Sequence, residues 1–121
     1  MRELKFRAFH KSDGLIIEWG IIKQPAWNDC KVNLLYSILV SNKDAYHVMQ
    51  YTGLKDKNGK EIYEGDIVNI DGLIVPVIWY AGAWMVEYFT IPTKSYLSHF
   101  DELDVEIIGN KYENTELLSG N

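Results

Sequence analysis

The stretch from Tyr51 to Ile70 constrains the fold more than any other part of the sequence. It contains Asn58-Gly59 between two short runs that can each form a strand. Asn-Gly is the strongest two-residue hairpin signal, because both central residues of a type I′ turn need a positive φ angle. Glu64-Gly65-Asp66 then indicates a bend, and residues 67–70 have the β-branched content of a strand that enters a core. We therefore predict a hairpin with Asn58 and Gly59 at the centre of its turn, followed by a buried strand.

Further turn signals continue this β pattern after residue 70. Asp71-Gly72 predicts a second two-residue hairpin, and Ala81-Gly82-Ala83 turns the chain again. Pro76 lacks a backbone N–H, which favours an edge position or a bulge for its strand. The three strands that these turns join span residues 66–70, 73–80 and 84–89. They are rich in Val, Ile, Trp and Tyr, which predicts a meander that curls into a small barrel.

The meander should supply most of the core. We expect one cluster to contain most of the large apolar side chains on its strands, namely Ile67, Val68, Ile70, Val77 and Trp79. Trp79 and Trp84 flank the Ala81-Gly82-Ala83 turn, so a contact between the two rings across the strands is expected.

The N-terminal part of the chain predicts a further hairpin. Residues 4–9 alternate, with Leu4, Phe6 and Ala8 on one face, which is typical of a strand with one buried face. Ser12-Asp13-Gly14 supplies a turn, and residues 15–19 return as the partner strand. Residues 32–40 fit a helical period and a buried strand equally well. Residues 45–51 are expected to form the strand that enters the central stretch.

The C-terminal part adds short elements. Residues 96–103 place Tyr96, Leu97, Phe100 and Leu103 on one stripe, which predicts a short helix. Residues 105–109 predict a last strand, and residues 114–118 a capped helical turn. The predicted fold is therefore mostly β (β-rich α+β): an antiparallel meander curling into a small barrel-like sheet, with one or two short helices near the C-terminus. We expect a single domain over residues 1–121.

The central stretch resembles the signature of the YopX family, which consists of small proteins encoded by phages and prophages. Residues 50–68 read QYTGLKDKNGKEIYEGDIV, and two outer segments also fit: residues 4–9, LKFRAF, and residues 107–114, IIGNKYEN. The resemblance implies a phage or prophage origin and a single YopX-like domain. It implies no catalytic residues, because the biochemical function of the family is unassigned.

Composition limits the compartment and the chemistry. A chain of 121 residues with 47% hydrophobic residues can bury a core without disulfides. Cys30 is the only cysteine, which rules out an intrachain disulfide and the CxxC spacing of zinc or redox sites. The N-terminus is charged where a signal peptide would be apolar, and residues 73–80 are too few to span a bilayer, which needs about 20. We expect a cytoplasmic protein of the bacterial host cell that binds no cofactor and no membrane.

The charge distribution weighs against nucleic acid as the partner. The net charge is −5; residues 101–116 alone carry −5, whereas residues 1–11 carry +3. Nucleic-acid binding draws on phosphate neutralisation by Lys and Arg. Basic and aromatic residues nevertheless alternate near the hairpin tip, as they do on small barrels that bind oligonucleotides. Acidic neighbours leave residues 55–66 with a net charge of −1, which favours a solvated turn over a binding surface.

No spacing of residues indicates a catalytic or metal site. His10, His47 and His99 have no carboxylate or cysteine at ligand spacing. Glu64 and Asp66 could act as an acid–base pair in a hydrolase, but acidic residues beside glycine usually accept hydrogen bonds from local backbone N–H groups. Trp27, in a loop near Pro25, is a candidate for an exposed anchor at an interface.

We therefore expect a non-enzymatic module that binds itself or another macromolecule of the phage or host. Self-association is favoured because an exposed sheet edge invites strand addition and because 16 aromatic residues exceed what a small core needs. A nucleic-acid-binding small β-barrel is the alternative, and a carboxylate-dependent hydrolase is a weaker one. The candidate interaction residues are Trp27, Tyr51, Lys55, Lys57, Lys60 and Tyr63.

Overall fold

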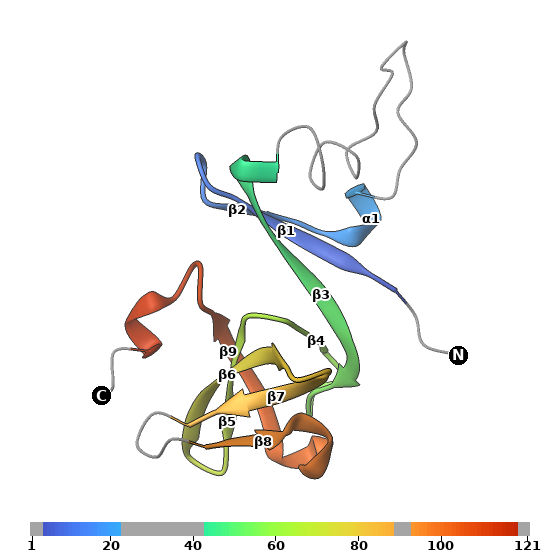
Figure 1. The fold of residues 1–121 in the computed structure, drawn as a ribbon, viewed down its shortest axis with the longest axis vertical. Helices are drawn as coiled ribbons and strands as arrows, with labels where there is room; N and C mark the ends of the chain where they lie inside the picture. The colour runs from blue at the N-terminus through green and yellow to red at the C-terminus, as the bar shows by residue number, and fades with distance from the viewer. Residues whose placement is uncertain (1–3, 23–42, 89–92, 119–121) are drawn as a thin grey trace. The chain divides into compact units, whose positions relative to one another are not determined.

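The computed structural model describes residues 4–22, 43–88 and 93–118. The chain divides into two compact units: the described residues up to Gln50 form the N-terminal unit, and those from Tyr51 onward form the C-terminal unit. Strand β3 (Tyr46–Lys55) contributes its first half to one unit and its second half to the other (Figure 1). A single domain over residues 1–121 stays a prediction.

The N-terminal unit contains a small antiparallel sheet in which β1 pairs with both β2 and the first half of β3. Its elements are β1 (Phe6–His10), β2 (Leu15–Ile17), the one-turn helix α1 (Trp19–Ile22) and the 3₁₀ turn η2 (Lys43–Ala45). Ala8 and Ile22 are buried, and Ile17, Trp19 and Val48 pack against them. One face of β1 is therefore covered, as its alternating pattern predicts.

The predicted N-terminal hairpin is confirmed, with Ala8 opposite Ile17. Its turn is fixed by Asp13, whose Oδ1 accepts the N–H of Leu15 at 3.1 Å. Two details differ. Leu4 lies outside β1 and is exposed, and Trp19 begins α1 instead of extending the return strand. The ambiguous segment 32–40 lies outside the described residues.

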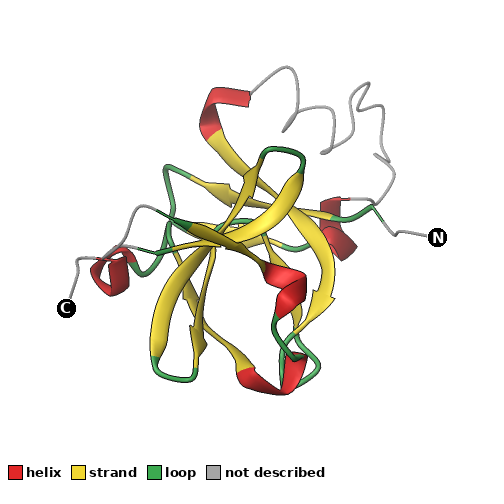
Figure 2. Ribbon diagram, turned by 60° about the horizontal axis from the view of Figure 1, so that its bottom comes forward, coloured by secondary structure: helices red, strands yellow, loops and turns green. Residues whose placement is uncertain are grey.

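The C-terminal unit contains a five-stranded antiparallel sheet with the order β8-β7-β6-β5-β9, together with the pair formed by β4 and the end of β3. Its strands are β4 (Glu61–Tyr63), β5 (Asp66–Ile70), β6 (Leu73–Tyr80), β7 (Ala83–Glu87), β8 (Lys94–Tyr96) and β9 (Val105–Asn110). The described part of this unit also contains 3₁₀ turns. The turns η3 (Leu97–His99) and η4 (Glu102–Asp104) lie between β8 and β9, and η5 (Thr115–Leu118) follows β9. The sheet is curled (Figure 2). The predicted fold class, mostly β with a curled meander and short helical turns, is confirmed.

Two tight turns shape the meander as the sequence predicts. Asp71 and Gly72 have φ angles of +52° and +92°, and Ile70 lies opposite Leu73. Ala81 and Gly82, with φ angles of +52° and +82°, connect β6 to β7 in the same way. Positive φ at both central residues is the requirement of a type I′ turn, whose twist matches that of the flanking strands.

The turn at Asn58-Gly59 differs from the prediction. Gly59 has a φ angle of +77°, but Asn58 is not among the described residues with positive φ. The N–H of Gly59 donates to the carbonyl of Asp56 at 3.0 Å, so Lys57 and Asn58 are the central residues and Gly59 is the last. The prediction that both Asn58 and Gly59 are central is therefore wrong. The side chain of Asp56, described below, selects this five-residue connection between β3 and β4.

Replacing Gly59 with valine should lower the free energy of unfolding by about 1–2 kcal/mol, because a β-branched residue is strained at positive φ. A Cβ atom at Gly59 would meet nothing within 4 Å, so a steric clash with other residues adds no penalty. Urea unfolding measures the change, and Lys60→Val is the control because it places the same side chain at an exposed position of the same loop. Equal unfolding midpoints for the two variants would contradict the strain at Gly59.

The core of the C-terminal unit lies inside the curled sheet. Its buried side chains include Ile62, Val68, Ile70, Val75, Val77, Val86, Leu97 and Val105. Four of the five predicted core residues are buried, but Trp79 is 48% exposed, and its assignment to the core is wrong. Trp79 is on the same face of β6 as Val75 and Val77, but it lies beyond the buried part of the strand. Its predicted contact with Trp84 is confirmed, with ring centroids 4.7 Å apart in an edge-to-face arrangement.

Pro76 does not mark an edge strand, because β6 lies between β5 and β7. The strand tolerates proline for a local reason. The paired part of β6 with β7 begins at Val77, opposite Val86, one residue after Pro76. Pro76 therefore lies outside that ladder, where the missing N–H removes no hydrogen bond to β7.

The helix predicted over residues 96–103 is also absent. Tyr96 ends β8, and the 3₁₀ turns η3 and η4 follow, separated by Phe100 and Asp101. Leu97 is buried, whereas Leu103 is 69% exposed, so the stripe does not share one environment. Asp101 accounts for the break, because its Oδ1 accepts the N–H of Leu103 at 3.0 Å and starts a new turn. The last strand and the final helical turn are confirmed as β9 and η5.

Candidate interaction site

The carboxylate of Asp56 organises the tip of the β3–β4 hairpin. Its Oδ1 accepts the backbone N–H groups of Asn58 and Lys60, each at 2.9 Å. Its Oδ2 accepts the N–H of Ile107 in β9 at 3.0 Å. One side chain therefore shapes the loop and also attaches it to the edge of the five-stranded sheet.

The environment of Asp56 favours its charged form. Burial raises the pKa of this carboxyl group, since the side chain is 2% exposed, but the N–H groups of Ile107, Lys60 and Asn58 outweigh burial. The pKa of Asp56 therefore lies below its ordinary value of 3.8. Asp56 is ionised at neutral pH and acts as a structural acceptor.

The two tyrosines that flank the hairpin tip are buried. Tyr51 and Tyr63 lie opposite each other in the β3–β4 pair, with ring centroids 5.6 Å apart. They are 5% and 4% exposed. A stacking platform for nucleic-acid bases needs exposed ring faces, and these rings do not provide them.

The other candidate interaction residues have separate surroundings. Lys55, Lys57 and Lys60 are exposed at the hairpin tip. The Nζ atom of Lys57 lies 3.6 Å from the carboxylate of Glu106, so part of the positive charge is paired. Trp27 lies outside the described residues. That these residues take part in an interaction stays a prediction.

The carboxylates around the central bend also have structural roles. Asp66 is 1% exposed, and its Oδ2 accepts the N–H of Tyr63 at 2.7 Å, which confirms the predicted backbone contact. Glu61 accepts the hydroxyl of Tyr63 at 3.5 Å. Gly65 has a φ angle of +87°, and a Cβ atom there would lie 3.3 Å from the ring of Tyr112. The positive φ angle favours glycine at the bend, and a side chain there would also require the Tyr112 ring to shift slightly.

The C-terminal motif, residues 107–114, forms a turn around Asn110. Its Oδ1 accepts the N–H groups of Tyr112 and Glu113, and its amide donates to the carboxylate of Glu113 at 2.8 Å. The N–H of Lys111 donates to the carbonyl of Gly65 at 2.8 Å. This hydrogen bond links the C-terminal motif to the central bend. In both stretches, these polar residues hold turns in place and leave binding to other surfaces of the C-terminal unit.

An apolar pocket of about 150 Å³ lies in the C-terminal unit. Its apolar lining consists of Leu54, Ile62, Leu97, Phe100 and Val105. These residues come from β3, β4, η3, the following loop and β9, so the curl of the sheet brings together positions far apart in sequence. Lys55 and Glu102 are the two charged residues of the lining. No pattern in the sequence indicates this pocket.

The turn η4 forms an acidic rim beside the pocket. Residues 101–106 carry four carboxylates and no cation. Glu102 lines the apolar pocket, whereas Asp104 and Glu106 line a neighbouring polar hollow of about 250 Å³, together with Lys57 and Asp71. Leu103, which lies between Glu102 and Asp104 in the sequence, is exposed and also lines the polar hollow. The negative run in the sequence was a signal for this rim, but its proximity to an apolar pocket was not visible there.

A second apolar surface lies on the outer face of β6, β7 and β8. Val77 and Val86 point into the core, so the alternate residues Ile78, Met85 and Tyr96 point outward. Tyr96 lies opposite Met85 and is 49% exposed. We call this surface, completed by Tyr80 at 51% exposure, the outer aromatic face.

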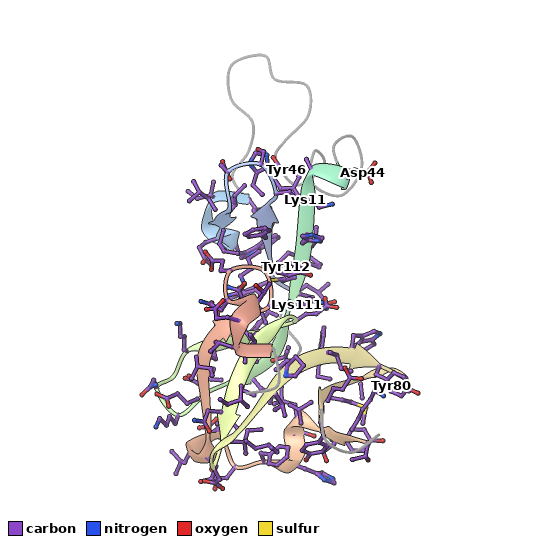
Figure 3. The ribbon with its side chains drawn as sticks, turned by 90° about the vertical axis from the view of Figure 1, so that its left-hand side faces the viewer. Lys11, Asp44, Tyr46, Tyr80, Lys111 and Tyr112 are labelled. Atoms are coloured by element: carbon purple, nitrogen blue, oxygen red, sulfur yellow. The ribbon has the colours of Figure 1, made fainter. Side chains whose placement is uncertain are left out.

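Tyr80 lies at the end of the β6–β7 hairpin, apart from Lys111 and Tyr112 (Figure 3). Its ring lies beneath the Nζ atom of Lys94, which is 4.3 Å from the ring centroid. Lys94 is also 3.6 Å from the carboxylate of Glu87. The outer aromatic face therefore has a polar margin on the side of β8.

The described histidines do not form a cluster. His10 lies 3.0 Å from Asp13 and beside Tyr46, and His47 stacks on Phe9. His99 belongs to the C-terminal unit. Within residues 4–22, 43–88 and 93–118, no group of three or more metal-binding side chains is suitably placed to hold an ion. The described helices also include none that is long and apolar enough to cross a membrane.

The fold defines a small antiparallel β protein with a curled sheet, and comparison of its sequence identifies the family. The family model described as YopX protein matches residues 5–119. The chain therefore belongs to the YopX family, as the resemblance in residues 50–68 implies. A search of curated proteins found no match.

Two solved structures share the fold. Protein EF1440 from Enterococcus faecalis is 23% identical, with a TM-score of 0.68, and the match covers 98% of this chain and 100% of that one. Protein YopX from Bacillus subtilis is 20% identical, with a TM-score of 0.61, and the match covers 95% of this chain and 98% of that one. At these identities the likeness shows the fold alone.

Proposed function

We propose that this chain is a phage- or prophage-encoded interaction module that works in the bacterial cytoplasm, catalyses no reaction and self-associates. The observation that carries the proposal is the outer aromatic face, where Tyr80 and Tyr96 are about half exposed beside a sheet edge. Aromatic residues are enriched at protein interfaces, and apolar patches beside edge strands favour association.

The two edges of the five-stranded sheet differ in a way that supports association through β8. The edge of β9 is covered at two points by the hairpin tip: Asp56 accepts the N–H of Ile107, and the N–H of Lys57 donates to the carbonyl of Val105 at 2.8 Å. Within the described residues, β8 pairs only with β7. A second copy that adds a strand at β8 would extend the sheet directly beside Tyr96, and the rest of that copy can then pack against the outer aromatic face.

Charge favours a protein partner over nucleic acid. Residues 51–121 contain five lysines and no arginine, against twelve Asp or Glu residues, which gives −7. A phosphate backbone would be repelled by this unit. The buried positions of Tyr51 and Tyr63 remove the stacking surface that the alternative of a nucleic-acid-binding barrel requires.

A non-enzymatic role agrees with how the acidic residues of the bend are used. Asp66 is buried and accepts a backbone hydrogen bond, as a structural carboxylate does. Neither the apolar pocket nor the polar hollow is lined by Glu64 or Asp66. Neither of these two pockets could therefore serve a hydrolase that uses Glu64 and Asp66.

Light scattering at several concentrations tests the proposal. We expect a mass of at least twice 14.0 kDa at high concentration, which falls towards 14.0 kDa on dilution. Tyr80→Glu should shift the protein to the monomer, because the new carboxylate lies on the outer aromatic face and can pair with Lys94. Leu15→Glu is the control, since it places the same charge at an exposed apolar position of the other unit.

A constant mass of 14.0 kDa would refute self-association. Loss of the oligomer in Leu15→Glu but not in Tyr80→Glu would move the interface away from the outer aromatic face. Nuclease treatment of the purified protein provides a further comparison, because a mass that falls only after nuclease would favour the nucleic-acid alternative.

A further inference from the structure

We infer that the apolar pocket binds a linear segment of another protein in which an apolar side chain stands next to lysine or arginine residues. This inference rests on the proposed role as an interaction module, but it uses a different surface from the outer aromatic face. It names the chemistry of the partner, which the proposed function leaves open.

The size of the pocket limits its occupant. Small-molecule and cofactor sites usually measure about 300–1,000 Å³, and this pocket measures about 150 Å³. One aliphatic or aromatic side chain is therefore the ligand that matches it. Buried Ile62, Leu97 and Val105 belong both to the pocket lining and to the core, so the floor is part of the packed interior. An anchor side chain on such a preformed floor needs little rearrangement of the protein.

The charge around the pocket selects the residues beside that anchor. Glu102 lines the pocket, and the rim continues through Asp104 to Glu106. One cation, Lys57, is paired with Glu106 at 3.6 Å, and Lys55 is the single cation of the pocket lining. The rim therefore keeps a negative excess, and Lys or Arg residues on either side of the anchor would complement it.

The same charge argues against two other occupants. Nucleic acid would bring phosphates to a rim of carboxylates, which is unfavourable. The acidic rim of a second copy would also be repelled, so the rims of two copies should not face each other. A basic segment of a different protein is the occupant that satisfies both the pocket and its rim.

The inference is tested by selecting displayed random heptapeptides on the purified full-length protein. Enriched peptides should contain Leu, Ile or Phe beside Lys or Arg. The most enriched peptide is then labelled and its affinity measured by fluorescence anisotropy, at low and at high salt. Affinity should fall with salt, because exposed charges are screened. Changing its apolar residue to glycine, or its basic residues to glutamate, should each weaken binding by about tenfold or more.

Variants of the protein locate the site. Ser98→Trp fills the pocket from η3 and should weaken peptide binding about tenfold or more. The double variant Glu102→Lys and Asp104→Lys should weaken it by about fivefold or more. Its control is Glu18→Lys with Asp44→Lys, which changes the net charge equally at two exposed positions of the N-terminal unit and should leave affinity within about twofold. Thermal unfolding of each variant shows that the fold is retained.

The possible outcomes separate this inference from the proposed self-association. Tyr80→Glu should retain peptide binding while it loses the oligomer, and Ser98→Trp should do the reverse. If no peptide is enriched, or if the enriched peptides lack the basic–apolar pattern, the inference fails while self-association stands. Equal binding by Ser98→Trp and the unmodified protein would also overturn it.

Discussion

Replacing Ile67 with alanine should lower the free energy of unfolding by about 2–5 kcal/mol. Ile67 is completely buried, and it lies between Pro76 of β6 and Gly109 of β9 in the register of the sheet. Its side chain is on the opposite face from Val68, which belongs to the main core cluster. Truncation therefore leaves a cavity on the outer face of β5, where the surrounding strands are held by their ladders and can collapse only in part.

Urea unfolding followed by tryptophan fluorescence measures this loss. Leu103→Ala is the matched control, because it removes a large aliphatic side chain from a position that is 69% exposed, and it should change stability by less than about 0.5 kcal/mol. If Ile67→Ala costs no more than Leu103→Ala, the burial of Ile67 on a covered face of β5 is contradicted.

The turns show where sequence signals are sufficient. At Asp71-Gly72 both residues adopt positive φ readily, so the local preference decides the turn. At Ala81-Gly82 only the glycine does, and the pairing of β6 with β7 on either side holds Ala81 at +52°. At Asn58-Gly59 the same local preference competes with the carboxylate of Asp56, which accepts hydrogen bonds from two loop N–H groups and from Ile107. The last of these bonds joins residues 51 positions apart, and no local pattern contains it.

The errors in the strand and helix predictions have separate origins. Pro76 predicts an edge strand because a proline lacks the N–H that a central strand needs for its ladder. The sequence does not show that the paired part of β7 stops short of Pro76. Residues 96–103 predict a helix because their apolar spacing fits one, but Asp101 starts a new turn and leaves Leu103 in solvent. The extent of the neighbouring strand decides the first case, and a local side-chain hydrogen bond decides the second.

The candidate site was less predictable than the fold. Tyr51 and Tyr63 were expected as flanking aromatic residues, and the pairing of their strands buries them. The apolar pocket combines residues as distant as Leu54 and Val105, each of which looks like an ordinary core position in sequence. The acidic run of residues 101–106 was visible, but its value as a rim depends on Phe100 and Leu97 being folded beside it.

The stretches that carry the family resemblance have a structural explanation. Asp56, Asp66 and Asn110 each accept backbone N–H groups, and Gly65 supplies a positive φ angle. These are requirements of the turns, independent of any ligand. Residues that determine binding should then be sought on the surfaces around this frame, such as the pocket and the outer aromatic face.

Asp56→Asn should lower the free energy of unfolding at pH 7 by about 2–4 kcal/mol, because hydrogen bonds to a charged acceptor contribute about 1.5–3 kcal/mol each. The carboxylate accepts N–H groups with both oxygens. An asparagine has one oxygen, so its NH₂ group must face either the loop N–H groups or that of Ile107. Asp71→Asn is the matched control, since Asp71 is exposed with a φ angle of +52°, which asparagine tolerates.

The contribution of Asp56 should also depend on pH with a definite sign. Burial raises the pKa of Asp56, but the N–H groups of Ile107, Lys60 and Asn58 lower it more, so the folded pKa lies below 3.8. A depressed folded pKa contributes stability that is fully present above the unfolded value of about 3.9 and is lost as pH falls through the folded pKa. Urea unfolding at pH 7, 4 and 3 should therefore show the difference between the unmodified protein and Asp56→Asn becoming smaller towards pH 3. A difference that stays constant over this range would mean that the charge of Asp56 does not stabilise the hairpin tip, and that its shape alone is sufficient.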